Sequence, residues 1–286
     1  MSAGSLRARV QTVDEQLAPR VTAFLEQPEP GMDRTDAVLA HQQLLDAIDR
    51  HEYRRLLIWP EGEPAAVAHL STSGTLVVAG TREAGADFAT HLSGSGWRVL
   101  LGDAPLADCI LESSPRPMMR RRSHAREQRF MATRTCADLP TPAGLRIADM
   151  HDLGAISELA CRLHVEDRMG PPLSRGARSG VTERMRSSVR REATWVVEQG
   201  GDVAAKFDIS LRSPARGAQI AGVYVKREHR GAGLAARGVA AVARHLMTVE
   251  RMPGVTLHVR SDNAPGRRAY ERAGFADRGA WTLALR

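Results

Sequence analysis

A glycine-rich turn suited to binding an anion lies in the second half of the chain. The turn follows a strand-like run, 219–225, and opens a long alanine-rich helical pattern. At such a junction, unpaired backbone N–H groups and the positive end of the helix dipole face the same point. Glycines at 231 and 233 let a ligand approach the backbone closely. The run therefore predicts a pyrophosphate cradle made of Arg230, Gly231, Ala232, Gly233, Leu234 and Ala235.

A second motif follows at a fixed distance downstream. Asn263 and Tyr270 have the spacing N-x(6)-Y, and the pair Gly274-Phe275 ends the same segment. Asn263 is a favourable N-cap for a helix, because Pro265 lies in the first turn. A phenol such as that of Tyr270 can donate a proton to a leaving thiolate.

Both motifs resemble the Gcn5-related N-acetyltransferase (GNAT) family, R-x-x-G-x-G/A for the turn and N-x(6)-Y for the helix. The resemblance is specific from about Ala143 to the C-terminus. The chain as a whole is similar to a bacterial member of the family with an extra divergent N-terminal domain. It implies an α+β fold in that half, with a mixed, mostly antiparallel central sheet flanked by helices. It also implies acetyl-CoA as cosubstrate.

The resemblance further assigns roles to individual residues. The backbone N–H and C=O groups of Val223, Tyr224 and Val225 would hold the pantetheine arm and polarise the acetyl carbonyl. Tyr270 would be the general acid and would contact the cofactor, and Asn263 would contact the coenzyme arm. We therefore expect direct transfer of the acetyl group to a primary amine, without an acyl-enzyme.

The general base is less well defined, because the run 219–225 has no carboxylate. His258 lies five residues before Asn263, and strand alternation places it on the face opposite Val255, Leu257 and Val259. An imidazole with an ordinary pKa near 6.5 is able to accept a proton. The alternative is a histidine that is simply hydrogen-bonded on the sheet face.

Four charged residues are secondary candidates. Carboxylates at Glu166, Asp167 and Asp208 would orient or neutralise the incoming amine. Lys206 is one of two lysines in the chain. It would bind an anionic substrate group or occupy an exposed strand position.

Length and composition favour two domains. The chain has 286 residues, 43% of them apolar, which is enough for two cores. We place the domains at residues 1–135 and 136–286. Three scattered cysteines, Cys109, Cys136 and Cys161, exclude a disulfide framework or a cysteine metal site, so no metal is expected. No signal sequence or membrane span is apparent, and a cytoplasmic protein with no membrane partner is the expectation.

The basic charge is a weak guide to partners. The net charge is +7, yet of 40 basic residues only Lys206 and Lys226 are lysines. Such a skew indicates a coding bias, and coenzyme phosphates would use part of the charge. No nucleic-acid-binding motif is present, so a nucleic-acid partner is not predicted.

The first half reads as a mixed α and β pattern. Helices are predicted at 6–26 and 35–50, with Asp33 or Thr35 as a cap. Strands are predicted at 55–59, 65–70, 75–79 and 97–101, with a helix near 84–92. This α/β order resembles a degenerate GNAT-like repeat without a complete cradle, so we expect it not to bind coenzyme A. The arginine-rich segment 115–135 is predicted to join the domains, as a solvated connection, an edge strand or a basic rim.

The second half gives a longer series of elements. Helices are predicted at 151–164, 180–191, 233–248 and 264–273. Strands are predicted at 145–147, 194–198, 203–211, 218–225, 255–259 and 281–285. The function that these observations favour is an acetyl-CoA-dependent N-acetyltransferase acting on a small-molecule or peptide amine. The alternatives are a different acyl- or aminoacyltransferase on the same fold and a non-catalytic acyl-CoA-binding sensor. The acceptor and the oligomeric state cannot be read from the sequence.

Overall fold

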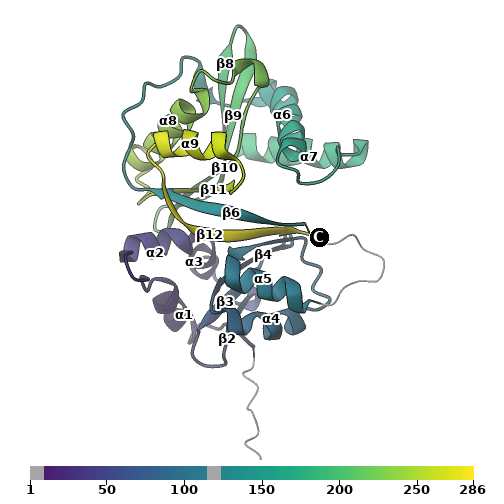
Figure 1. The fold of residues 1–286 in the computed structure, drawn as a ribbon, viewed down its shortest axis with the longest axis vertical. Helices are drawn as coiled ribbons and strands as arrows, with labels where there is room; N and C mark the ends of the chain where they lie inside the picture. The colour runs from purple at the N-terminus through teal and green to yellow at the C-terminus, as the bar shows by residue number, and fades with distance from the viewer. Residues whose placement is uncertain (1–9, 115–123) are drawn as a thin grey trace, which may run out of the picture. The chain divides into compact units, whose positions relative to one another are not determined.

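The chain folds into two compact units. The computed structural model describes residues 10–114 and 124–286 (Figure 1). One unit comprises residues 1–128 with 279–286, and the other residues 129–278. These boundaries differ from the predicted 1–135 and 136–286 mainly at the C-terminus. There strand β12 (Ala276–Leu285) pairs antiparallel with β5 (Val99–Asp103), so the end of the chain belongs to the first unit.

The first unit has helices on both faces of a sheet. Its strand order is β1-β2-β3-β4-β5-β12, with β1 at Gln11–Thr12, β2 at Leu56–Trp59, β3 at Ala66–Leu70 and β4 at Thr75–Gly80. Helices α1 (Ala18–Leu25) and α3 (Gln42–Asp49) share one core with Val77 and Ala79. Helices α4 (Gly85–His91) and α5 (Ala104–Ser113) share another with Leu76 and Val78. This alternation along β4 follows from the two-residue period of a strand.

Two predicted helices of this unit differ from the structure. Within the predicted helix 6–26, the described part holds the short strand β1 and then α1, and residues 1–9 lie outside the described residues. The predicted helix 35–50 is two helices, α2 (Arg34–Ala40) and α3, which meet at His41. His41 leaves helical geometry at φ −105°, and its Nδ1 lies 2.6 Å from the carbonyl oxygen of Leu25. The Asp33 cap is confirmed by a bond from the Asp36 N–H.

The second unit confirms the predicted α+β fold. Its strand order is β6-β11-β10-β9-β8-β7. The strands are β6 (His124–Thr133), β7 (Leu145–Ile147), β8 (Thr194–Gln199), β9 (Asp202–Ser213), β10 (Gly217–Val225) and β11 (Val255–Arg260). Helices α8 (Leu234–Thr248) and α9 (Ala264–Arg272) lie on one side of the sheet, and α6 (Leu153–Glu166) and α7 (Arg175–Arg190) on the other (Figure 1). Each pair of helices encloses its own apolar core.

The two units share one order of strand pairing. In the first, β1 to β4 pair antiparallel in sequence, and β4 then pairs parallel with β5 across α4. In the second, β7 to β10 pair antiparallel in sequence, and β10 then pairs parallel with β11 across α8. The first unit thus repeats the topology of the second. None of the described helices is long and apolar enough to cross a membrane.

Candidate functional site

The parallel strands β10 and β11 part soon after they pair. Their register joins Ala218 to Val255 and Gln219 to Thr256. Over the described residues that follow, β10 runs on to Val225 and β11 to Arg260 without pairing to each other. A strand edge exposed in this way can hold an extended ligand through its backbone N–H and C=O groups. The parted edge of β10 includes the predicted thioester-binding residues.

The corresponding strands of the first unit stay together. There β4 and β5 pair continuously from Thr75–Val99 to Val78–Gly102. Helix α4 also begins against another helix, because a Cβ at Gly85 would lie 2.5 Å from Cys109 of α5. In this unit, neither the strand edge nor the helix start is open.

The glycine turn follows β10 after a short 3₁₀ helix, Arg227–His229. Gly231 and Gly233 have φ of 87° and 72°, the left-handed region that glycine adopts without strain. Gly233 is the N-cap of α8, and within the described chain no side chain caps this helix. A Cβ at Gly231 would meet nothing within 4 Å, and one at Gly233 would meet only the Arg272 guanidinium, at 3.8 Å. The first N–H groups of α8 and a nearby cation thus face open space, which fits a pyrophosphate.

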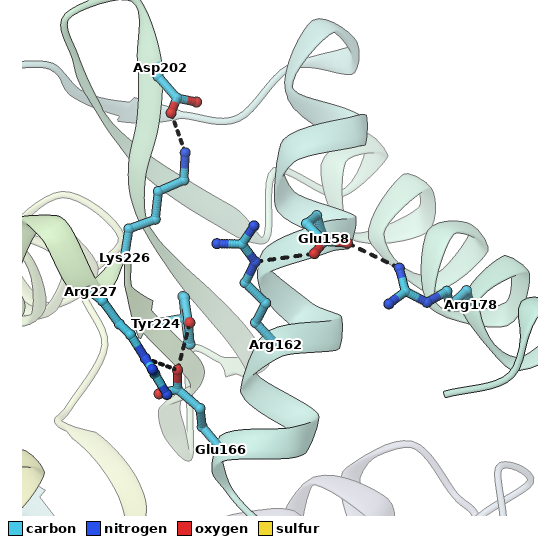
Figure 2. Close-up of polar contacts among 8 residues, drawn as sticks. All are labelled: Glu158, Arg162, Glu166, Arg178, Asp202, Tyr224, Lys226 and Arg227. Carbon is cyan, nitrogen blue, oxygen red and sulfur yellow. Dashed lines mark hydrogen bonds and ion pairs between the residues drawn. The ribbon is translucent and has the colours of Figure 1, made fainter. Parts of the chain in front are cut away.

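Glu166, the last residue of α6, ties the ends of several elements together. Its carboxylate accepts a bond from the Tyr224 hydroxyl at 2.9 Å and one from Arg227 at 3.3 Å, as Figure 2 shows. It also accepts a bond from Arg230 Nη2 at 2.8 Å. Its backbone oxygen accepts one from Arg260 Nη1 at 2.9 Å, at the end of β11. Glu166 therefore holds α6, β10, the glycine turn and β11 at one place.

These contacts fix the charge states at this junction. Burial acts to raise the pKa of Glu166, but hydrogen bonds from Arg230 and Tyr224 outweigh it and hold the pKa below its ordinary value. Burial and the bond to Glu166 raise the pKa of Tyr224. At neutral pH the pair is therefore a carboxylate and a neutral phenol. Arg230 also donates from Nε to the Val225 carbonyl at 2.8 Å, so this predicted cofactor residue shapes the turn itself.

Charged side chains of α6 and α7 lie beside this junction. Arg162 of α6 and Arg178 of α7 both bond to Glu158, each at 3.1 Å, and in Figure 2 Arg162 extends towards the end of β10 while Arg178 reaches Glu158 from α7. Two guanidinium groups thus share one carboxylate. This leaves a net positive charge close to Tyr224.

Asn263 and Tyr270 occupy the positions that the motif predicts on α9. The Asn263 side chain accepts a bond from the Gly266 N–H at 3.0 Å, which confirms it as the N-cap. Tyr270 is half-buried and packs against the core beneath α8. Burial, with a smaller effect of the Asp167 charge, raises the pKa of its phenol. Tyr270 therefore stays protonated at neutral pH, as a proton donor must.

His258 is on the predicted face of β11 but has little basicity. Val255, Leu257 and Val259 belong to the core under α8, and His258 lies on the other face, with its ring 5.3 Å from that of Phe130. Burial lowers the pKa of His258 to about 3. A general base works best with a pKa near the working pH, so this imidazole is a weak one.

The secondary candidates are all held in ion pairs. The predicted exposed position for Lys206 is wrong, because this residue is fully buried. Its ammonium contacts Asp208, and Asp167 lies 3.8 Å from Arg260 Nη1. Strand alternation puts Lys206 on one face with Asp208, but the local sequence does not show that the fold buries this face.

The segment 115–135 lies partly in β6, within the sheet of the second unit, and residues 115–123 lie outside the described residues. Arg129 of β6 pairs with Asp277 at 2.8 Å. Across residues 10–114 and 124–286, no group of His, Cys, Asp and Glu is suited to a metal ion.

The comparisons with known proteins agree with this geometry. Residues 160–275 match the acetyltransferase (GNAT) family. Comparison with curated proteins gives no match.

Three solved structures share the fold over nearly the whole chain. A GNAT-family acetyltransferase from Colwellia psychrerythraea has 12% identity and a TM-score of 0.56, covering 97% of this chain and 98% of that one. A GCN5-related N-acetyltransferase from Sphaerobacter thermophilus has 19% identity and a TM-score of 0.55, covering 97% and 94%. A tandem GNAT protein from the clavulanic acid biosynthesis pathway has 13% identity and a TM-score of 0.52, covering 97% and 98%.

At these identities the three likenesses concern the fold. The family match covers the parted strands, the glycine turn and the motif helix α9. Residues 160–275 therefore form a domain of the acetyltransferase (GNAT) family.

Proposed function

We propose that the second unit transfers the acetyl group of acetyl-CoA directly to a primary amine. The observation that carries the proposal is the parting of β10 and β11 beside an open, uncapped helix start at Gly233. A single extended ligand with a pyrophosphate at one end and an acyl group at the other fits both features. The first unit has the same strand order without either feature, so we assign the cosubstrate to the second unit alone.

Each end of the ligand would meet different groups of the chain. The N–H groups at the start of α8, together with Arg272, would hold the pyrophosphate. Backbone groups of Val223, Tyr224 and Val225 would hold the pantetheine arm and polarise the thioester carbonyl. The Tyr224 hydroxyl already donates to Glu166, so the backbone of Tyr224, not its side chain, would make these contacts.

Tyr270 would protonate the departing thiolate. Its phenol stays neutral because burial raises its pKa, so the proton is present when the thioester breaks. His258 would be neutral but weakly basic. We therefore propose that the acceptor reacts as the free amine and releases its proton to solvent. In that case, kcat/KM should rise with pH along the titration of the acceptor amine, even in a variant without His258.

The test is a calorimetric titration of acetyl-CoA, followed by thiol release with a panel of primary amines. Saturable binding to the full-length protein and amine-dependent thiol release support the proposal. Absence of binding would refute it. A stable acetylated protein, formed with acetyl-CoA in the absence of an amine, would refute direct transfer.

A second candidate is a non-catalytic acyl-CoA-binding role. It is favoured by the weak basicity of His258 and by the ion pairs that hold Glu166 and Asp208. Tight acetyl-CoA binding without turnover across the amine panel would favour this role over catalysis.

A further inference from the structure

A buried ion pair lies beneath the strand that we propose to hold the thioester. Lys206 of β9 is fully buried, and its ammonium contacts the carboxylate of Asp208, two residues along the same strand. Asp208 also accepts a bond from the Thr194 hydroxyl at 3.0 Å, and Thr194 bonds to Ser188 at 2.9 Å. A buried ammonium is costly unless it is paired with an opposite charge and hydrogen-bonded. Here Asp208 supplies the opposite charge, and Thr194 and Ser188 extend the hydrogen bonds around it.

The third contact of Lys206 is with the backbone of β10. Its Nζ donates to the carbonyl oxygen of Gly222 at 2.9 Å. Gly222 lies in a β-bulge, where the pairing with β9 shifts between Ala221 and Tyr224. Its φ is 57°, and a Cβ at this position would lie 2.2 Å from Asp208 Oδ2. The ion pair and the bulge therefore fit each other, and only glycine leaves room for both.

This contact fixes the direction of the next amide. The C=O of Gly222 and the N–H of Val223 belong to one planar peptide group. Among the described peptide bonds the one cis bond is Trp59–Pro60, so this group is trans and its two polar bonds point in opposite directions. Because the Gly222 oxygen faces the buried ammonium, the Val223 N–H points away from it.

We infer that Lys206 and Asp208 are positioning residues that hold the peptide 222–223 so that the Val223 N–H faces the acyl carbonyl. The inference rests on the proposed function, because the carbonyl is that of bound acetyl-CoA. A buried ion pair contributes little net stability compared with apolar residues of the same size. Its specific effect here is geometric, since it selects one orientation of a peptide at a bulge that could otherwise rotate.

The test compares a charge-free pair with a matched control. K206M/D208N removes both charges and the bond to Gly222, and the new amide still accepts from Thr194. The control is K226M, which removes the chain's other lysine and its pair with Asp202 (Figure 2). The side chain of Asp202 is 61% exposed. The probe is acetyl-CoA with a ¹³C-labelled carbonyl, and the readout is its stretching band in difference infrared spectra.

We expect wild type and K226M to shift the band of bound acetyl-CoA to lower wavenumber than that of free acetyl-CoA. In K206M/D208N the cradle is intact, so acetyl-CoA should bind while the band returns to the free position. Turnover should fall about 100-fold, the loss typical of removing one oxyanion donor. D208N alone is the milder variant, and its band should lie between those two positions.

Two results would overturn the inference. If the carbonyl band of bound acetyl-CoA has the same position in wild type, K206M/D208N and D208N, the ion pair does not orient the amide. Failure of wild type to bind acetyl-CoA, measured by calorimetry, would instead overturn the proposed function and the inference with it.

Discussion

Replacing Gly233 by alanine distinguishes an effect on acetyl-CoA binding from an effect on folding stability, because the same replacement at Gly200 provides a matched control. Gly233 and Gly200 have φ of 72° and 60°, so an alanine is strained at both. Neither site is crowded, since a Cβ would lie 3.8 Å from Arg272 at Gly233 and would meet nothing within 4 Å at Gly200. The left-handed conformation costs a non-glycine residue about 1–2 kcal/mol. Both variants should therefore lose about the same free energy of unfolding.

The effect on acetyl-CoA binding should differ sharply. A methyl group at Gly233 would enter the space in front of the first N–H groups of α8, whereas Gly200 lies in the turn between β8 and β9. A hydrogen bond to a charged group contributes about 1.5–3 kcal/mol, so losing two such bonds costs about 3 kcal/mol or more. Since about 1.4 kcal/mol corresponds to tenfold in Kd, G233A should bind acetyl-CoA about 100-fold more weakly than wild type.

Calorimetry with acetyl-CoA, together with urea unfolding of both variants, checks this expectation. G200A should bind like wild type and unfold like G233A. If G233A binds acetyl-CoA as tightly as G200A does, the glycine turn is not the pyrophosphate site. If both variants lose binding equally, the loss comes from strain and carries no information on the cradle.

The remaining predictions concern proton transfer and pH. Y270F should lower kcat by about 100-fold or more, the usual effect of removing a general acid, with an unchanged Kd for acetyl-CoA in calorimetry. The pKa of His258 is lowered to about 3, so between about pH 6.5 and pH 3 the unfolded chain binds more protons than the folded one. The free energy of unfolding, measured by urea titration at each pH, should therefore fall from about pH 6.5 towards pH 3, and it should fall less in H258N. Hydrogen bonds from Arg146 hold the pKa of Asp152 below its ordinary value against burial, so this pair should stabilise the fold at neutral pH and weaken as pH falls below about 4. D152N should lose about 2 kcal/mol at pH 7, and its difference from wild type should shrink as the pH falls below about 4 in the same titrations.

Features set by neighbouring residues could be predicted from the sequence. The glycine turn, the Asn263 cap and the start of α8 are local, because a glycine and a short polar side chain fix the backbone within one turn. Most strands of both units were predicted for the same reason, since each is a short apolar run between turn residues. The exceptions are β1, which lies within a predicted helix, and β6, for which a strand was only one of the alternatives. The predicted start of α7 was five residues late, because Gly176 and Gly180 lower helix propensity in a segment that is nevertheless helical from Arg175.

Features set by distant residues could not be predicted. Glu166 is 58 residues from Tyr224 and 64 from Arg230, and nothing in its own segment indicates that it would join them. The last strand was assigned to the second domain because its sequence does not indicate its partner, β5. Helix α5 was missed, since its short apolar segment gave too weak a period. The site is thus predictable as a pair of motifs, but the groups that orient it are not.

The contrast between the two units indicates what makes the second one a site. In the first, β4 pairs with β3 in an unbroken register, and its partner β5 stays beside it. In the second, β10 is bulged at Gly222, and β11 leaves it after two residue pairs. A bulge disrupts the local pairing of a strand and increases its twist. The pairing of β10 with β9 shifts first between Gln219 and Ile220, where β11 also leaves β10, and again around Gly222. The same strand order therefore stays closed where the register is unbroken and parts where it is irregular, so the irregular pairing of β10, more than the topology, marks the opening that we propose for the cosubstrate.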